Sequence, residues 1–221
     1  IMNETDYDLC QIITQSIRIK SCCEQIWTPS FEQELRKIIR NANFDVEGSE
    51  QLLQLLAAAL NYQICDPLIV TDLGSSLSTK HADRRFMALN LIADSCSRPP
   101  IPQELLRFVN ESVFPKVTDF LNDEPMIAER VLRILSFVAC SDRSIVPSIA
   151  ALPVLPQIFS KVNNSPAALM LSYHIVQSSG IGIDRLAEAG LTDAIIASFN
   201  QNGSTAAVDL LYSVLTAVSV Q

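Results

Sequence analysis

The sequence lacks the features that a membrane span or a β-sheet would require. No uncharged apolar run approaches the roughly 18 residues that a transmembrane helix needs, so we expect no membrane span. Alternating runs of β-branched residues bounded by turn pairs, which are typical of strands, are also missing. Only six of the 221 residues are glycine, and 48% are hydrophobic. This composition favours a folded, all-α protein.

Motifs of catalytic sites are missing as well. The chain contains no Gly-x-x-x-x-Gly-Lys phosphate loop, no His-Glu-x-x-His and no Gly-x-Ser-x-Gly. Its two histidines, His81 and His174, do not lie near a cysteine or a carboxylate pair in a pattern typical of nucleophilic catalysis. We therefore expect a non-catalytic protein with neither a cofactor nor a metal site. We interpret His174 as a hydrogen-bonded packing residue, and a place in a binding groove is the alternative.

Basic charge is scarce, with 16 lysines and arginines against 24 acidic residues and a net charge of −8. Because neutralised phosphates provide most of the affinity for nucleic acid, a nucleic-acid partner is not expected. The densest basic set is Arg84, Arg85, Arg130 and Arg133. These arginines could form a patch for a carboxylate-rich or phosphorylated partner. We favour the alternative that they are solvated charges, with Arg130 and Arg133 meeting Glu129 and neighbouring acids.

The cysteines favour a reducing, cytoplasmic location. Most lie within apolar helical patterns, where a free thiol behaves as a small hydrophobe. The adjacent pair Cys22 and Cys23 would point about 100° apart on a helix, which favours neither a disulfide nor a zinc site. Since the chain starts at Ile1 without a signal peptide and ends in an apolar helix, we expect it to be a segment of a longer protein. The six cysteines are Cys10, Cys22, Cys23, Cys65, Cys96 and Cys140.

Three segments, 112–121, 150–159 and 190–199, align with one another at a spacing of 38 and 40 residues. Each has a bulky apolar residue at its sixth and at its tenth position, and each is followed by a polar turn and a longer apolar-periodic segment. This order is typical of stacked helical repeats. The aligned residues are Val117, Leu155 and Ile195 at the sixth position, and Leu121, Phe159 and Phe199 at the tenth.

The periodicity predicts three units of three helices, over residues 102–140, 142–180 and 182–221. Their long third helices begin after the caps Asp123, Ser165 and Ser204, and Pro166 occupies the first helical position of the second. Residues 1–98 are less regular and form single or paired helices. The helices expected there are 6–26 after Thr5, 31–41 with a capping box of Ser30 and Gln33, 50–63 after Ser49, 67–77 and 82–96.

The segment from Glu188 to Phe199 resembles the turn and second helix of armadillo repeats. Gly190 stands at the turn, where a near right-angle change of direction needs backbone freedom or close approach, and the small residues Ala150 and Ser112 replace it in the other units. The resemblance is strong over 102–221, moderate over 64–98 and weak before that, and HEAT repeats, which pair two helices, are a fair description of the first half. It implies one right-handed α-solenoid of armadillo/HEAT-like repeats over residues 1–221.

In peptide-binding armadillo proteins the third helices line a groove, and an asparagine ladder there holds an extended ligand. Alignment on the core patterns puts Leu91, Ile134, His174 and Val214 at the ladder position, and a shift of one residue puts Asn90, Arg133, Tyr173 and Ser213 there. Neither register contains a ladder, so importin-like capture of a basic peptide is not expected. The partner-binding residues that we predict are Asn90, Asp94, Arg130, Arg133, Tyr173 and Gln177.

The last helix is rich in apolar residues, and residues 149–221 carry only four acids and two bases. A terminal repeat normally needs a polar outer face. Either further repeats follow, or this end docks on another chain or on a second copy, with Leu211, Val214 and Val218 as the interface. We therefore expect a protein–protein interaction scaffold that binds through the groove or this end. The alternatives are a regulatory domain of a larger kinase, motor or GTPase-effector protein, and a homodimerisation module.

Overall fold

A computed structural model describes residues 4–44, 49–178, 180–202 and 205–219. Every regular element in these ranges is helical, and none is a strand, which confirms the all-α prediction. The contacts group the chain into two compact units. Unit 1 comprises Ile1–Arg98 with Pro102–Ser112, and unit 2 comprises Pro99–Ile101 with Val113–Gln221. The predicted three-helix unit 102–140 is thus divided between them, and a single solenoid over residues 1–221 stays a prediction.

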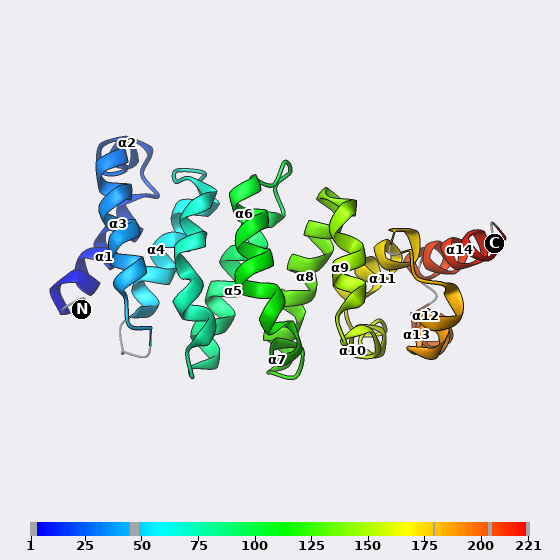
Figure 1. The fold of residues 1–221 in the computed structure, drawn as a ribbon. Helices are drawn as coiled ribbons and strands as arrows, with labels where there is room; N and C mark the ends of the chain where they lie inside the picture. The colour runs from blue at the N-terminus through cyan, green and yellow to red at the C-terminus, as the bar shows by residue number, and fades with distance from the viewer. Residues whose placement is uncertain (1–3, 45–48, 179, 203–204, 220–221) are drawn as a thin grey trace. The chain divides into compact units, whose positions relative to one another are not determined.

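In unit 1 the helix pairs pack through apolar faces. Helix α4 contacts α1 and α5, and the 3₁₀ segment η1 contacts α3, α5 and α6 (Figure 1). The buried side chains of α4, among them Leu52, Leu53 and Leu56, form much of the core. The elements are α1 (Glu4–Ser16), α2 (Lys20–Ile26), α3 (Pro29–Asn41), α4 (Ser49–Asn61), η1 (Pro67–Ser78), α5 (Ala82–Cys96) and α6 (Gln103–Phe108), followed by a π-helical turn (Val109–Val113).

Several local predictions for unit 1 are wrong. The leading helix breaks between Ser16 and Lys20, where the side chain of Ile17 is buried. Helix α3 is capped by Thr28, whose hydroxyl accepts from the Phe31 N–H at 3.2 Å, and not by Ser30. Ser49 is the first residue of α4, and its buried hydroxyl has no hydrogen-bond partner among the described residues. Residues 67–78 form a 3₁₀ helix that begins after Asp66, whose carboxylate accepts from the Leu68 N–H. Thus the caps depend on the local chain path as well as on residue type.

In unit 2 the order of two short helices and one long helix recurs. Helix α11 packs against α8 on one side and α14 on the other, while α10 contacts α11 and α13 (Figure 1). The elements are η3 (Phe114–Lys116), α7 (Val117–Leu121), α8 (Pro125–Ser141), η4 (Arg143–Ile145), α9 (Val146–Ala151), α10 (Leu155–Ser160), α11 (Pro166–Ser178), α12 (Ile183–Glu188), α13 (Leu191–Asn202) and α14 (Thr205–Ser219).

The aligned apolar positions of the repeat belong to the core of unit 2. Val117, Leu121, Phe159 and Ile195 are buried, whereas Leu155 and Phe199 are half-buried. Because each second helix has one face against its own third helix, the sixth and tenth positions, which lie one turn apart, share a buried face.

Of the three caps predicted for the third helices, one is confirmed, one is wrong and one lies outside the described residues. The Ser165 hydroxyl accepts from the Ala168 N–H at 2.9 Å, which confirms this cap before Pro166. Asp123 does not cap α8: its carboxylate accepts from the adjacent Glu124 N–H, and Glu124 stands at the cap position. Ser204 lies outside the described residues.

Within the described ranges, no single helix is long and apolar enough to cross a membrane. The pair Pro125–Ser141 and Arg143–Ala151 meets the criteria of length and composition only when the two helices are taken together, and they are bent by 119°.

Gly190 adopts a left-handed backbone conformation at the turn between α12 and α13, with φ of +96°. A Cβ atom at this position would meet nothing within 4 Å, so backbone freedom, and not close approach, is the reason for glycine. We expect Gly190→Val to lower the free energy of unfolding by about 1–3 kcal/mol, because a β-branched residue is strained at positive φ. Urea denaturation would measure the change.

Gly182→Val is the matched control. Gly182 also has open space around it, but its φ is −59°, which valine adopts readily. Because Gly182 is the N-cap of α12, where valine is less favourable than glycine, the control should cost up to about 1 kcal/mol and less than Gly190→Val. Equal stability of the two variants would show that the turn at Gly190 does not need a glycine conformation.

Candidate functional site

The third helices of unit 2 line two hollows that meet at Met170. The first hollow, of about 360 Å³, lies between α8 and α11, and the second, also of about 360 Å³, lies between α11 and α14. We call these two hollows together the third-helix groove. The first is lined by Glu129, Arg130, Arg133, Ser136, Phe137, Pro166, Ala167 and Met170, and the second by Leu169, Met170, Tyr173, Gln177, Asp209, Tyr212 and Ser213.

The helix register brings the shifted set of ladder residues to this groove. Arg133, Tyr173 and Ser213 line it, whereas Ile134 and His174 are buried in the core. In unit 1, α5 shows the same division, since Leu91 is buried and Asn90 is half-buried. A step of one residue rotates a side chain by about 100°, so the packing of one apolar face determines which residues remain for the groove.

In the first hollow, the Arg133 guanidinium lies over the Phe137 ring, with 5.7 Å from its Cζ to the ring centroid. Arg133 is half-buried, and no carboxylate among the described residues lies within ion-pair distance of it. The expected pairing of Arg133 with Glu129 is therefore wrong. Glu129 is the only acidic residue that lines this hollow. The hollow is thus lined by two arginines, one glutamate and the Phe137 ring.

The second hollow combines aromatic rings with a polar edge. Gln177 Nε2 donates to Ser213 Oγ at 3.1 Å, and Ser213 Oγ donates to the Asp209 carbonyl at 2.8 Å. The Tyr212 side chain is 68% exposed, and the half-buried Tyr173 lies against the opposite wall. Such a hollow accommodates an apolar side chain and offers hydrogen-bonding groups to a neighbouring peptide backbone.

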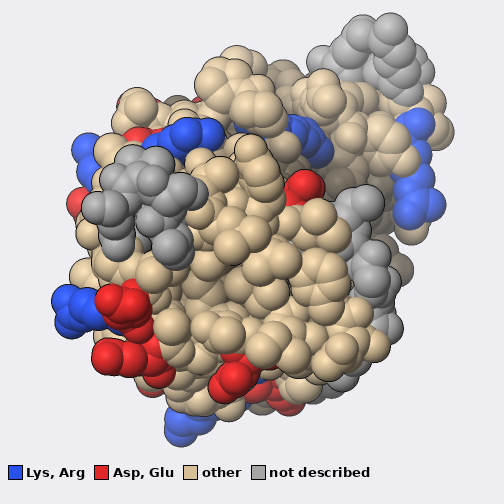
Figure 2. All heavy atoms as spheres, turned by 90° about the vertical axis from the view of Figure 1, so that its right-hand side faces the viewer, with Lys and Arg blue, Asp and Glu red and all other residues tan. Residues whose placement is uncertain are grey.

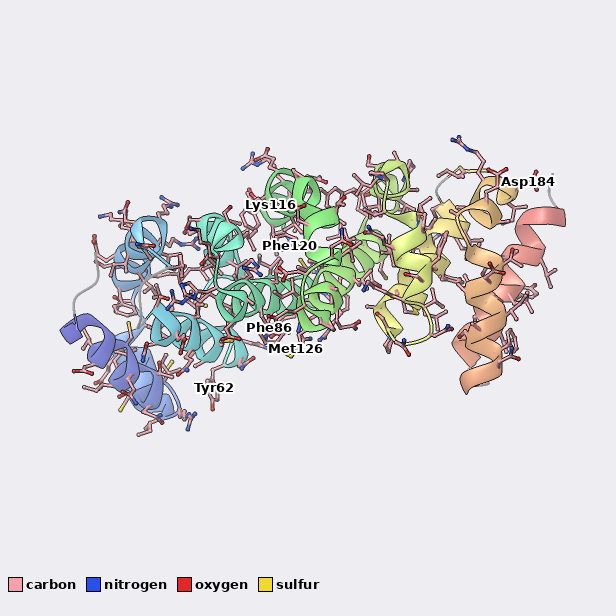
Figure 3. The ribbon with its side chains drawn as sticks, turned by 90° about the horizontal axis from the view of Figure 1, so that it is seen from below. Tyr62, Phe86, Lys116, Phe120, Met126 and Asp184 are labelled. Atoms are coloured by element: carbon pink, nitrogen blue, oxygen red, sulfur yellow. The ribbon has the colours of Figure 1, made fainter. Side chains whose placement is uncertain are left out.

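The other predicted partner-binding residues, Asn90 and Asp94, belong to α5 of unit 1. The Asn90 side-chain amide donates to the Asp94 carboxylate at 3.2 Å, across one helical turn. Both side chains are half-buried. Tyr62, at the C-terminal end of α4, projects away from its helix and is 52% exposed (Figure 3). Binding by Asn90 and Asp94 stays a prediction, as it does for the four residues of the third-helix groove.

A patch that includes all four arginines is not formed. Arg84 is buried, and its guanidinium donates to the Phe44 carbonyl, whereas Arg85 donates to the Thr79 carbonyl at 2.9 Å. Arg84 therefore holds the segment after α3 against α5. The sequence could not indicate this role, because residue 44 lies 40 positions away along the chain.

At the C-terminal end, the exposed apolar face of α14 differs from the predicted one. Leu211 and Val214 are half-buried, and the Val218 side chain lies outside the described residues. Val208, Tyr212 and Leu215 are 48%, 68% and 58% exposed and follow one another at helical spacing. Figure 2 shows a broad area without charged side chains at this end of unit 2, with charged groups at its margins.

Unit 1 contains a charged hollow that sequence reasoning missed. It has a volume of about 620 Å³ and lies between α3, η1 and α6. Arg36 pairs there with Glu32 at 3.0 Å and Asp72 at 3.3 Å, and Arg40 pairs with Asp72 at 2.7 Å. The i, i+4 spacing of Glu32 and Arg36 was a usable signal, but Asp72 comes from another element. These ion pairs hold α3 on η1.

The described residues contain no group of three or more His, Cys, Asp or Glu side chains arranged to hold a metal ion. None of the six cysteines is part of a disulfide. Burial raises the pKa of Cys65 to about 12, with a further contribution from the Glu32 carboxylate, and burial raises the pKa of Cys96 to about 12. These two thiols are therefore protonated at neutral pH and serve as packing groups.

No protein-family model matches the chain, and no curated protein matches it. Two solved structures are similar to it at 12% sequence identity. One is an engineered protein, with a TM-score of 0.69 over 98% of this chain and 91% of that chain. The other is a designed armadillo repeat protein in complex with the peptide (KR)4, with a TM-score of 0.68 over 94% of this chain and 90% of that chain.

These likenesses confirm the fold class. The chain has an armadillo-like helical-repeat fold, which belongs to the α-solenoid class. At 12% identity they establish the fold alone, so the function has to be argued from the residues of this chain.

His174 combines burial with an unpaired ring nitrogen. It is 7% exposed, and its Nε2 has no hydrogen-bond partner among the described residues, so the expected hydrogen-bonded role does not extend to that atom. Burial lowers the pKa of His174 below 6.5, and the Arg143 charge lowers it further. The unfolded chain therefore takes up a proton at a higher pH than the folded chain.

The free energy of unfolding should accordingly fall as the pH drops below about 6.5, and this contribution should be fully present above that pH. Urea denaturation between pH 7.5 and 5.5 would measure the slope. We expect His174→Gln to flatten it and His81→Gln, at an exposed position, to leave it unchanged. A slope that is the same in His174→Gln as in the parent chain would contradict the assignment.

Proposed function

We propose that unit 2 binds an extended segment of a partner protein in the third-helix groove and thus acts as a non-catalytic interaction scaffold. The observation that carries this proposal is the pair of neighbouring hollows along α8, α11 and α14, which share Met170 as a lining residue. The lining side chains stand on packed helices, so binding requires little reorganisation. The exposed Gln177 side chain, held by its bond to the buried Ser213 hydroxyl, offers hydrogen-bonding groups of the kind that a peptide backbone needs.

The fold likeness supports a peptide or protein as the partner. The similar designed armadillo repeat protein is in complex with the peptide (KR)4. The groove of this chain differs in chemistry from one suited to a basic peptide, because Arg130 and Arg133 line its first hollow and neither hollow is lined by an asparagine. The free cysteines favour a reducing compartment, and we propose that the protein acts in the cytoplasm.

A second candidate function, self-association through α14, is favoured by the apolar face of Val208, Tyr212 and Leu215. Exposed apolar groups on one helix face are typical of interaction surfaces. A second copy would bury the same face on both partners around a two-fold axis.

If the groove binds peptides, the affinity of peptides selected on this protein should depend on Tyr173. Random octapeptides displayed on phage would be selected on the whole chain, and synthetic copies would be measured by fluorescence polarisation. We expect Tyr173→Ala to weaken the binding of these peptides by about tenfold or more, because an aromatic residue at the centre of an interface contributes about 1–3 kcal/mol to the binding free energy.

Tyr62→Ala removes an exposed tyrosine outside this groove and should leave the affinity unchanged. Thermal melting followed by circular dichroism would check that both variants fold. A selection without binders, or binders that ignore Tyr173→Ala, would refute binding in the groove.

Self-association predicts a mass that rises with concentration in light scattering. Val208→Glu or Leu215→Glu should then give a monomer, because each places a charge on the exposed face of α14 without entering the core. Met126→Glu, at an exposed apolar position of α8, is the control and should leave the mass unchanged. A parent chain that is monomeric at every concentration would exclude this function.

A further inference from the structure

We infer that the ligand of the third-helix groove is an acidic–apolar peptide. An aspartate or glutamate side chain occupies the hollow at Arg133, and a bulky apolar side chain two or three residues away occupies the hollow at Tyr173 and Tyr212. This inference rests on the proposed function and adds the chemistry of the partner to it.

The acidic preference follows from the surroundings of Arg133. Its half-buried guanidinium lies over the Phe137 ring and has no carboxylate of the described chain within ion-pair distance. The ring restrains the guanidinium plane, and a partly buried site strengthens charge–charge interactions relative to water. A carboxylate can accept two parallel N–H bonds from such a group. A lysine or arginine side chain would meet like charge from Arg133 and Arg130 instead.

Glu129 reduces this preference but does not reverse it. It is the one acidic side chain that lines the hollow, against the two arginines. The guanidinium that has no carboxylate of the described residues within ion-pair distance is that of Arg133. A single carboxylate from the partner would neutralise it.

The apolar preference follows from the second hollow. Leu169, Met170, Tyr173 and Tyr212 provide apolar or aromatic surface, and Met170 is 46% exposed although it joins the two hollows. The polar groups Gln177 and Ser213 bond to each other along the edge. A bulky aliphatic or aromatic side chain would cover the exposed apolar atoms, while the exposed Gln177 side chain stays available to the peptide backbone.

The spacing of the two ligand side chains follows from helix packing. Helix α11 packs directly against α8 and α14, and the axes of packed helices lie about 8–10 Å apart. An extended peptide advances about 3.3–3.6 Å per residue. The acidic and apolar side chains are therefore two or three residues apart.

The test compares fluorescein-labelled octapeptides that differ at one position. The parent peptide carries Glu two residues before Phe in a Ser/Thr background, a second set uses a three-residue spacing, and matched peptides carry Gln or Lys in place of Glu. We expect the Glu peptide to bind at least tenfold more tightly than the Gln peptide, and the Lys peptide to bind most weakly. Arg133→Gln should remove the preference for Glu over Gln without abolishing binding.

Arg185→Gln is the matched control, because Arg185 is an exposed arginine of the same unit on α12 and lies outside the groove. It should keep the preference for Glu. Random octapeptides selected on the parent chain provide a second measure, in which Asp and Glu should be enriched near Phe, Leu or Tyr.

The outcomes separate the two levels of inference. Peptides that bind in a Tyr173-dependent way with no preference for Glu, or with a preference for Lys, would overturn the acidic–apolar ligand and leave the groove proposal standing. A Glu preference that survives Arg133→Gln would also overturn it. If neither the designed peptides nor the selected library binds, both proposals fail.

Discussion

The packing of α11 between α8 and α14 is the constraint on which the rest of unit 2 depends. Each of these helices must bury an apolar face, and Ile134, Ile175 and Leu210 are fully covered as a result. Once those faces are buried, rotation of the helices about their axes is determined, and Arg133, Tyr173 and Ser213 are left to line the groove. Core packing and the candidate binding surface are thus two consequences of one helix register.

Burial and local partners divide the charged residues of both units into structural and available groups. Arg84 is turned into unit 1 and holds the Phe44 carbonyl, and Arg36 is surrounded by the carboxylates of its own unit. Arg133 instead stands on the groove side of its helix over Phe137, without such a partner among the described residues. Residues of one type therefore differ in their role because burial and partners differ.

Much of the helical content could be predicted from periodicity, and the match is best where the pattern is long. Helix α5 has the predicted bounds, and α11 begins at Pro166 after the predicted cap Ser165. The exceptions are elements whose form depends on neighbours, such as the 3₁₀ segment at Pro67–Ser78 and the break after Ser16. Four predicted groove residues line the groove, but the sequence left two registers open, because an apolar stripe on a helix tolerates a shift of one position.

The sequence by itself determined the fold class, because apolar residues at helical spacing, repeated about every forty positions, can bury their faces only against neighbouring repeats. It also determined the turn at Gly190, since few other residues adopt positive φ. Tertiary structure alone decided which side chains are exposed on α14, which arginine has a carbonyl or carboxylate of its own chain, and that Met170 lines two neighbouring hollows. These properties depend on contacts between residues that are distant in the chain, which no local pattern specifies.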